Sequence, residues 1–473
     1  MEAGRHPVTR LSPATLPHPL AYDREAATIG IVHFGPGAFF RAHQAAYIDE
    51  LLASDPRWAI CAVALKTPGV RDALGPQDGL YTLVELGETT RFRTIGAIRE
   101  LLVASEDGVR VADRLASPDT RLVTLTVTEK GYCLKGDGSL DLDHPDIRHD
   151  LAEPMRPVSV IGWLVEGLAR RRAAGLPPFT TLSCDNLPAN GRKLKAAVVR
   201  LAQARDPVLA RWIETEARFP CSMVDSITPA TDDALRARVL AETGLEDAWP
   251  IQRETFTQWV IEDDLGPDAP DLASVGVTLT ADVEAWEAAK LRLLNGAHST
   301  LAYVGLLRGH ETVRDAMADA ELASFVRAMM LEDIAPSLRA PAGLDIPAYV
   351  EALLARFRNP AIAHRLSQVA WDGSQKLPIR ILGTVADALA AGRQIDRLAV
   401  PIAAWMRFIE RQARTGVAIV DPMAEGLSEV GRTATDPEAF LALETVFPRA
   451  LATNARFSEA VAPAYARLPD LPS

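Results

Sequence analysis

The sequence predicts an α/β fold for its N-terminal part, followed by a mostly α-helical C-terminal domain. Continuous apolar runs alternate with helical patterns through the first two-thirds of the chain, which is typical of a parallel sheet covered on both faces. From about residue 281 the strand signal fades and helical periodicity dominates. Because 473 residues are too many for one ordinary core, we expect two domains, at 1–284 and 285–473.

The expected elements follow from the period of the apolar residues. Four short apolar runs, several of them rich in β-branched residues, indicate buried strands at 28–34, 58–65, 122–128 and 179–183. Helical patterns cover 40–52 and 160–173. In the second domain they cover 282–308, 311–332, 346–357, 379–392, 399–415 and 436–454, with breaks near Gly373 and Pro378.

Charge and cysteine usage exclude several classes of protein. The net charge of −12 repels phosphate backbones, so we expect no nucleic-acid partner. The N-terminus lacks the pattern of a secretory signal, and no apolar run reaches the roughly 20 residues that cross a bilayer. The four cysteines are too far apart for a CxxC motif, which favours buried thiols over a zinc site. We therefore expect a cytoplasmic protein without a membrane anchor or a metal site.

A glycine-containing turn, Gly35-Pro-Gly37, follows the first strand and opens a helix. This context predicts a Rossmann-like dinucleotide-binding domain, in which glycines allow a tight turn and let a pyrophosphate approach backbone N–H groups. The third glycine of the usual motif is replaced by Phe40, and paired glycines also occur in ordinary turns. The candidate cofactor-binding residues here are Phe34, Gly35, Gly37, Ala38, Phe39 and Arg41.

The end of the second strand leaves the choice between NAD and NADP open. A carboxylate that binds the adenosine ribose commonly stands there, but this chain has Lys66, with Arg71 nearby. A cation at this place suits the 2′-phosphate of NADP. The alternative is that both are solvated surface charges.

Two further loops leave strand ends, where folds of this class bind ligands. The loop Thr126–Tyr132 contains Thr128, Glu129 and Lys130 as candidates, and the loop Ser183–Gly191 contains Asn186 as a possible donor to a substrate oxygen. Ordinary turn chemistry and a surface ion pair are the alternatives.

The segment Lys290–His298 is helical and carries three polar candidates. At about 100° per residue, Asn295 and His298 lie about 140° and 80° round the helix from Lys290, so all three can face one cleft. Gly296 costs about 1 kcal/mol in a helix, which makes sense where a ligand or a backbone passes close. The alternative is an exposed helix face with a hydrogen-bonded histidine.

These motifs together resemble the long-chain polyol dehydrogenases, the mannitol dehydrogenase family, which includes mannitol 2-dehydrogenases and fructuronate reductases. The resemblance covers nearly the whole chain and depends on seven ordered segments: GPGAFFRAHQAAYIDELL, TVTEKGYC, SCDNLPANG, FPCSMVDSITP, QWVIED, KLRLLNGAHS and DGSQKLP. The sequence departs from the family pattern in two ways. No acidic residue follows the second strand, and Ser226 stands where many relatives have arginine.

The resemblance implies an NAD(P)-dependent, zinc-independent secondary-alcohol dehydrogenase. Lys290 would be the acid/base, which requires an environment that depresses its pKa from about 10.4. Asn186 and Asn295 would donate to the alkoxide and His298 would orient the substrate. Lys130, Asp225 and Lys376 would bind substrate hydroxyls or a carboxylate. The family contains monomers, so a monomer is expected.

The substrate is a linear polyol or sugar acid under this interpretation. TEKGYC and DGSQKLP favour the D-fructuronate/D-mannonate pair, whereas SCDNLPANG and Asp247–Pro250 favour D-mannitol/D-fructose, and other polyols remain open. Two other classes are a catalytically silent dinucleotide sensor, which an intact Lys290, Asn295 and His298 set disfavours, and a helical interaction module over 300–473.

Overall fold

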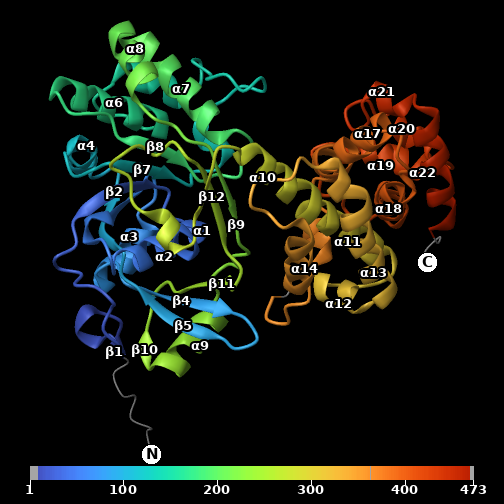
Figure 1. Cartoon of the computed structure of the whole chain (residues 1–473), viewed down its shortest axis with the longest axis horizontal. Helices are drawn as coiled ribbons and strands as arrows, with labels where there is room; N and C mark the ends of the chain where they lie inside the picture. The colour runs from blue at the N-terminus through green and yellow to red at the C-terminus, as the bar shows by residue number, and fades with distance from the viewer. Residues whose placement is uncertain (1–8, 363, 469–473) are drawn as a thin grey trace, which may run out of the picture. The chain divides into compact units, whose positions relative to one another are not determined.

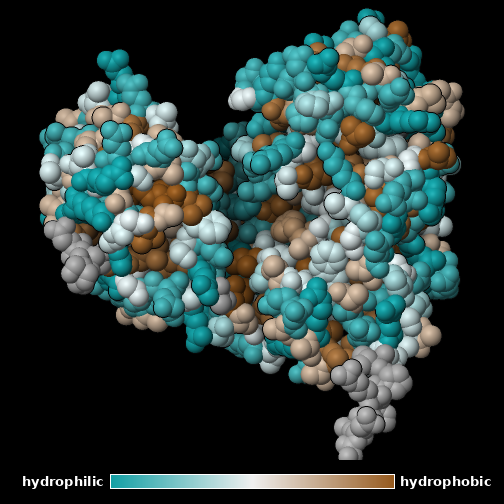
Figure 2. All heavy atoms as spheres, turned by 180° about the vertical axis from the view of Figure 1, so that it is seen from behind, coloured by the Kyte–Doolittle hydropathy of each residue, from teal (hydrophilic) through white to brown (hydrophobic). Residues whose placement is uncertain are grey.

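The computed structural model describes residues 9–362 and 364–468 and forms two compact units, Met1–Val283 and Glu284–Ser473 (Figure 1). This division lies one residue from the boundary expected from composition. Residues 1–7, which carry the expectation about targeting, lie outside the described range. Among the described residues, we find no helix that combines the length and the apolar character needed to span a bilayer. Hydrophilic side chains dominate the visible face of each unit (Figure 2).

A five-stranded sheet in the order β6-β3-β2-β7-β8 forms the centre of the first unit, and all its neighbouring strands are parallel. Its strands are β2 (Ile29–Phe34), β3 (Ala59–Ala64), β6 (Ile98–Val103), β7 (Leu122–Leu125) and β8 (Thr180–Ser183). The Rossmann-type fold is thus confirmed, and four strands match the expected runs. The run expected to continue to Thr128 ends at Leu125, because the next residues turn away and Thr128 adopts a φ of 67°.

Both faces of this sheet are buried, which explains the continuous apolar runs. Val32 and Phe34 of β2 pack on one face and Ile31 packs on the other. The first face is covered by α4 (Gly108–Ala116), α6 (Val160–Ala173), α7 (Asn190–Arg205) and α8 (Pro207–Glu216). The second face meets α2 (Gln44–Leu51), which α1 (Ala38–Ala42) precedes. The helix expected over 40–52 is therefore two helices, with His43 between them.

Two small mixed sheets complete the first unit, and sequence analysis did not anticipate them. One has the order β11-β4-β5 and the other β13-β12-β9. Their strands are β4 (Tyr81–Leu86), β5 (Arg91–Ile95), β9 (Ser222–Asp225), β11 (Ile251–Glu254), β12 (Gln258–Glu262) and β13 (Thr278–Thr280). A two-stranded pair joins β1 (Thr9–Arg10) to β10 (Leu245–Glu246), and the remaining helices are α3 (Gly69–Leu74), α5 (Pro145–Ala152) and α9 (Asp233–Thr243).

The second unit is helical, as expected, and α11 (Asn295–Leu307) lies in its interior. Nearly every residue of α11 is buried, as its all-round apolar pattern requires. The other helices are α10 (Val283–Ala289), α12 (Val313–Ala318), α13 (Ala320–Ala328), α14 (Ile346–Phe357), α15 (Leu366–Val369), α16 (Gly373–Leu377), α17 (Gly383–Ala390), α18 (Asp396–Thr415), α19 (Ala424–Thr433), α20 (Glu438–Leu441), α21 (Arg449–Ala452) and α22 (Ala455–Arg467).

Two expectations for this unit are wrong. Residues 436–454 do not form one helix, because Pro448 lacks the N–H that would continue it and restricts the residue before it. The expected break near Gly373 is confirmed, since α15 ends at Val369 and α16 begins at Gly373. The expected break near Pro378 is absent. Instead, α16 runs into a π-helical turn, Pro378–Leu382. Similar π turns occur at Lys290–Leu294 and Met329–Ile334.

Candidate functional site

The turn after β2 has the geometry that a pyrophosphate site requires. Gly35 has a φ of 89°, and a Cβ on it would lie 2.2 Å from the carbonyl oxygen of Thr126, so only glycine fits there. Gly37 differs, because a Cβ on it would meet no protein atom closer than 3.9 Å. The protein therefore does not itself need a glycine at position 37, and the open space beside it fits a ligand that approaches the backbone.

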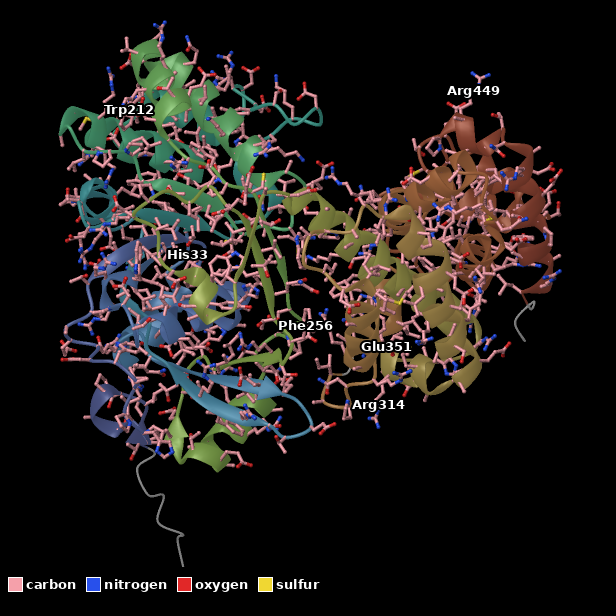
Figure 3. All side chains as sticks on the ribbon, viewed as in Figure 1. His33, Trp212, Phe256, Arg314, Glu351 and Arg449 are labelled. Atoms are coloured by element: carbon pink, nitrogen blue, oxygen red, sulfur yellow. The ribbon has the colours of Figure 1, made fainter. Side chains whose placement is uncertain are left out.

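A buried histidine, His33, supports this turn. The His33 ring nitrogens make hydrogen bonds with Thr124 Oγ1 (2.7 Å) and Thr126 Oγ1 (3.0 Å), which link β2 to β7 and the residues after it (Figure 3). Burial lowers the pKa of His33 to about 3, so the ring is neutral. Phe40, which replaces the third glycine, stacks on His33 with ring centroids 3.4 Å apart. The motif thus departs from the usual pattern because an aromatic pair fills this place.

The other candidates around the turn differ in how they are placed. Phe34 and Arg41 are buried, while Ala38 and Phe39 are partly exposed. Arg41 donates from Nη1 to the carbonyl of Trp249 (2.8 Å), and its guanidinium lies 5.0 Å from the centroid of that indole. Arg41 therefore holds helix α1 against Trp249, and its role in cofactor binding stays a prediction.

The cations after β3 are already paired with carboxylates. β3 lies beside β2 in register, with Val63 opposite Phe34, so Lys66 follows the strand next to the glycine turn. Lys66 Nζ lies 3.1 Å from a carboxylate oxygen of Asp146 on α5. Arg71 contacts Glu106 at 2.6 Å and Asp72 at 3.0 Å. Both cations that could bind the 2′-phosphate of NADP therefore already have a carboxylate partner.

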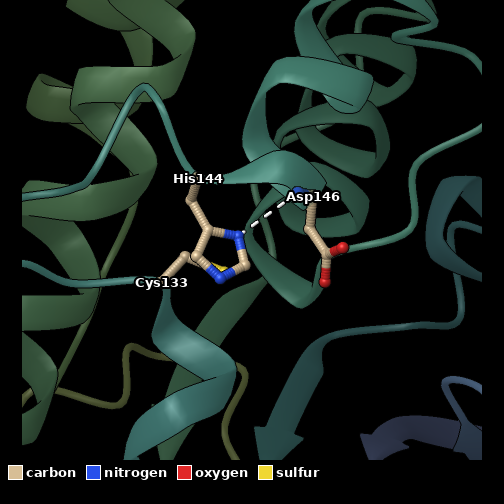
Figure 4. Close-up of side chains that lie close together, drawn as sticks. All are labelled: Cys133, His144 and Asp146. Carbon is tan, nitrogen blue, oxygen red and sulfur yellow. Dashed lines mark hydrogen bonds between the residues drawn. The ribbon is translucent and has the colours of Figure 1, made fainter.

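Cys133, His144 and Asp146 gather beside this ion pair, with potential metal-binding atoms within 4.8 Å of one another (Figure 4). His144 Nδ1 accepts the backbone N–H of Asp146 (3.2 Å), and the Asp146 carboxylate contacts Lys66. Burial and the nearby carboxylates raise the pKa of the Cys133 thiol to about 11. These side chains thus have protein partners, and the absence of a metal site stays a prediction. All four cysteines of the chain are buried free thiols.

A buried carboxylate joins the two loops that sequence analysis singled out. Asp185 accepts the backbone N–H groups of Val127 (3.2 Å) and Thr128 (2.8 Å) and the hydroxyl of Tyr132 (2.8 Å). Burial raises the pKa of Asp185 although these donors oppose the shift. The network holds Thr128 at its positive φ of 67°, a strained backbone of the kind that clusters at functional sites.

Asn190 holds the second loop against its neighbours. Its buried side chain donates to the carbonyls of Ser183 and Ser222 and accepts the N–H of Gly191. Asn186 stands in the loop so held and is exposed, as are Glu129 and Lys130. Asp225 is buried at the end of β9. The roles of Asp185 and Asn190 had no signal in the sequence, because each depends on partners far along the chain.

The second unit contains the other predicted site residues. Lys290 is buried and begins the π turn Lys290–Leu294, and Asn295, which is partly buried, begins α11. A π turn is wider than an α turn, so the angle of about 140° expected between these residues does not apply. π turns occur frequently at functional sites. Gly296 allows the close approach of another backbone, since a Cβ on it would lie 3.1 Å from the carbonyl oxygen of Arg380.

His298 presents an unsatisfied polar atom in a cationic environment. Its side chain is buried, and its Nε2 has no hydrogen-bond partner among the described residues. Burial, and then the charges of His364, Arg356 and Arg380, place the pKa of His298 well below its usual value. The ring is therefore neutral and available for a hydrogen bond with a hydroxyl group.

Lys376 and Arg380 lie one helical turn apart on α16 and the π turn that follows. Lys376 is half-buried, and both burial and the charge of Arg380 lower its pKa. Arg380 donates from Nη1 to Ser299 Oγ (3.1 Å), and burial lowers its pKa also. Sequence analysis included Lys376 but missed Arg380, which stands just after the segment DGSQKLP.

The predicted site residues thus form two sets, one on each unit. The first unit has the glycine turn with Lys66, Thr128, Glu129, Lys130, Asn186 and Asp225, at or just after strand ends. The second has Lys290, Asn295, His298 and Lys376. The first set can cradle a dinucleotide, and the second offers an amine, an amide and a neutral imidazole to a polar substrate.

A Rossmann-type unit followed by a helical unit is the domain order of a family of dehydrogenases. Residues 29–273 match the model of the mannitol dehydrogenase Rossmann domain, and residues 282–469 match that of the mannitol dehydrogenase C-terminal domain. The chain therefore belongs to the mannitol dehydrogenase family, whose members act on secondary alcohols of polyols and sugar acids. The resemblance found from its motifs is confirmed.

Named relatives cover almost the whole chain. It is 43% identical to the D-mannonate oxidoreductase of Escherichia coli K12 over 460 residues, 95% of each protein. A solved Pseudomonas fluorescens mannitol 2-dehydrogenase, in a ternary complex with NAD and D-mannitol, is 38% identical with a TM-score of 0.79. The match covers 98% of this chain and 95% of that one. A D-sorbitol dehydrogenase structure is 34% identical with a TM-score of 0.90, over 98% of both chains.

Proposed function

We propose that the chain is a fructuronate reductase, which interconverts D-fructuronate and D-mannonate with NAD as its cofactor. The observation that carries this proposal is that the charge of Arg380 acts on both the half-buried Lys376 and His298, whose Nε2 is unpaired, and this setting suits a polyhydroxylated acid. The 43% identity to a D-mannonate oxidoreductase supports the same substrate pair. D-mannitol/D-fructose is the second candidate, supported by the likeness to mannitol 2-dehydrogenase.

In this proposal, the buried amine of Lys290 takes the hydroxyl proton during oxidation and returns it to the oxygen during reduction. A bound nicotinamide supplies the hydride chemistry at the neighbouring carbon. Asn295 donates a hydrogen bond to the oxygen as its negative charge develops, and such a donor contributes about 3–4 kcal/mol in related reactions. His298, which is neutral, orients a substrate hydroxyl. No step requires a metal.

The preference for NAD follows from the charges after β3. The cofactor would lie on Gly35 and Gly37, with Thr128 and Glu129 at the next strand end. Lys66 and Arg71, the cations suited to a 2′-phosphate, are paired with Asp146 and with Glu106 and Asp72. The neighbourhood has more carboxylates than cations, so an added phosphate would meet net repulsion.

The test is a steady-state survey of the purified protein with NADH and NADPH against D-fructuronate and D-fructose. We expect the highest kcat/KM with D-fructuronate and NADH. A higher kcat/KM with D-fructose would select the second candidate. Absence of turnover with either ketose would reject both and favour a silent dinucleotide sensor.

A further inference from the structure

We propose that Arg380 binds the carboxylate of the substrate and thereby selects sugar acids over neutral polyols. The inference rests on the proposed function and adds to it a residue that determines specificity. It follows from the surroundings of the Arg380 guanidinium, which lies within the second unit together with Lys290, Asn295 and His298.

Arg380 is a half-buried cation without a counter-charge. Within the described part of the chain it forms no ion pair, and its one hydrogen bond goes from Nη1 to Ser299 Oγ. A guanidinium has five N–H donors, so most of them lack a protein partner. A charge removed from water without a partner is costly, and a ligand carboxylate would offset that cost.

Two of the site candidates, Lys376 and His298, lie within reach of the Arg380 charge. Its charge lowers the pKa values of both Lys376 and His298, which shows that the three side chains share one region. The carboxylates that act on Lys376 belong to Asp372 and Asp421, and neither forms an ion pair with it among the described residues. Asp421 instead accepts the hydroxyl and N–H of Ser374. Because neither carboxylate forms an ion pair with Lys376 or Arg380 among the described residues, both cations remain available to an anionic substrate.

The backbone fixes the position of the Arg380 guanidinium relative to α11, the helix that begins at Asn295 and contains His298. The π turn that contains Arg380 packs against Gly296, which lies between Asn295 and His298. Ser299, the next residue after His298, holds Nη1. A planar guanidinium can bind a carboxylate with two parallel hydrogen bonds, while His298 Nε2 remains available for a hydroxyl of the same molecule.

The test compares binding of D-mannonate and D-mannitol by calorimetric titration at saturating NADH, where neither ligand is turned over. The variants are Arg380→Gln, Arg380→Lys and the control Arg314→Gln, which removes an exposed positive charge of α12 in the same unit (Figure 3). We expect Arg380→Gln to weaken D-mannonate binding about 30- to 100-fold and to change D-mannitol binding less than about threefold. Arg380→Lys should recover part of the loss, and Arg314→Gln should bind both ligands as the parent does.

Equal losses for both ligands would show that Arg380 only supports the fold, and no loss would show that the carboxylate binds elsewhere. Either result overturns the inference. Turnover assays separate it from the proposed function. If D-fructose is the better substrate but D-mannonate binding still depends on Arg380, the proposed function fails and the inference stands. If D-fructuronate is reduced equally well by Arg380→Gln, only the inference fails.

Discussion

At the scale of single residues, the two glycines of the turn after β2 serve different purposes. Gly35 is required by the protein itself, because of its positive φ and the carbonyl of Thr126 beside it. Gly37 has an ordinary φ of −70° and open space where a Cβ would be. Packing against the protein therefore does not require the second glycine, and the open space beside it suits a ligand.

This difference gives a matched pair of variants. Gly37→Ala should fold with a loss of at most about 1 kcal/mol, as for alanine at a helix N-cap, but should bind NADH at least tenfold more weakly. Gly35→Ala should lose several kcal/mol of stability, because its Cβ would clash with backbone. Thermal melts and fluorescence titration of NADH measure the two effects. Unchanged NADH affinity in Gly37→Ala would contradict a cofactor at this turn.

The sequence could point to candidates whose proposed role depends on local chemistry, such as the glycines and the Lys290, Asn295 and His298 set. It could not identify Asp185 or Arg380. The role of Asp185 arises only when two loops some 57 residues apart meet at its carboxylate. Arg380 becomes notable only because folding buries it without a counter-charge. Gly296 is an intermediate case, since a close backbone approach was expected there and is found.

At the scale of elements, the exposed ion pair between the end of β3 and α5 determines the expected cofactor preference. Lys66 and Asp146 are joined across 80 residues of sequence. Asp146→Asn should free Lys66 and raise the affinity for NADPH relative to NADH about three- to tenfold, a modest change because exposed pairs are weak. Asp143→Asn, an exposed acid three residues earlier, is the control. Parallel binding titrations with NADPH and NADH measure the ratio of the two affinities. An unchanged ratio would show that Asp146 does not affect the cofactor preference.

The strands of the central sheet were predictable because both of its faces are buried, which leaves continuous apolar runs. The small sheets were not, since β11 pairs with β4 from about 170 residues away and neither strand has a distinctive run. The π turns also leave no mark in the sequence, because they differ from α turns only in hydrogen-bond register. The expectation of a single helix over 436–454 was wrong because Pro448 interrupts the apolar periodicity that predicts it.

At the scale of the whole molecule, buried neutral imidazoles make stability depend on pH. The pKa of His33 is about 3 in the folded protein, below the usual 6.5. The unfolded chain therefore binds more protons below about pH 6.5, and the contribution of His33, complete above that pH, is lost as pH falls toward 3. Between pH 7.5 and 5.5 this histidine alone should reduce the free energy of unfolding by about 1.4 kcal/mol.

Chemical denaturation at pH 7.5, 6.5 and 5.5 checks this expectation. His33→Gln should show a shallower loss of stability with falling pH than the parent, whereas His18→Gln, at an exposed position, should show the parental slope. Identical slopes for the parent and His33→Gln would mean that His33 is not kept neutral by the fold.

The proposed reaction depends on Lys290 as the acid/base that acts together with a dinucleotide. The most direct measurement is the single-turnover rate of NADH oxidation by D-fructuronate in Lys290→Met, together with its NADH affinity. We predict a rate at least about 10³-fold lower, with NADH binding within about twofold of the parent, because Lys290 belongs to the second unit and the glycine turn to the first. A rate within tenfold of the parent, with NADH still bound, would contradict the assignment of Lys290.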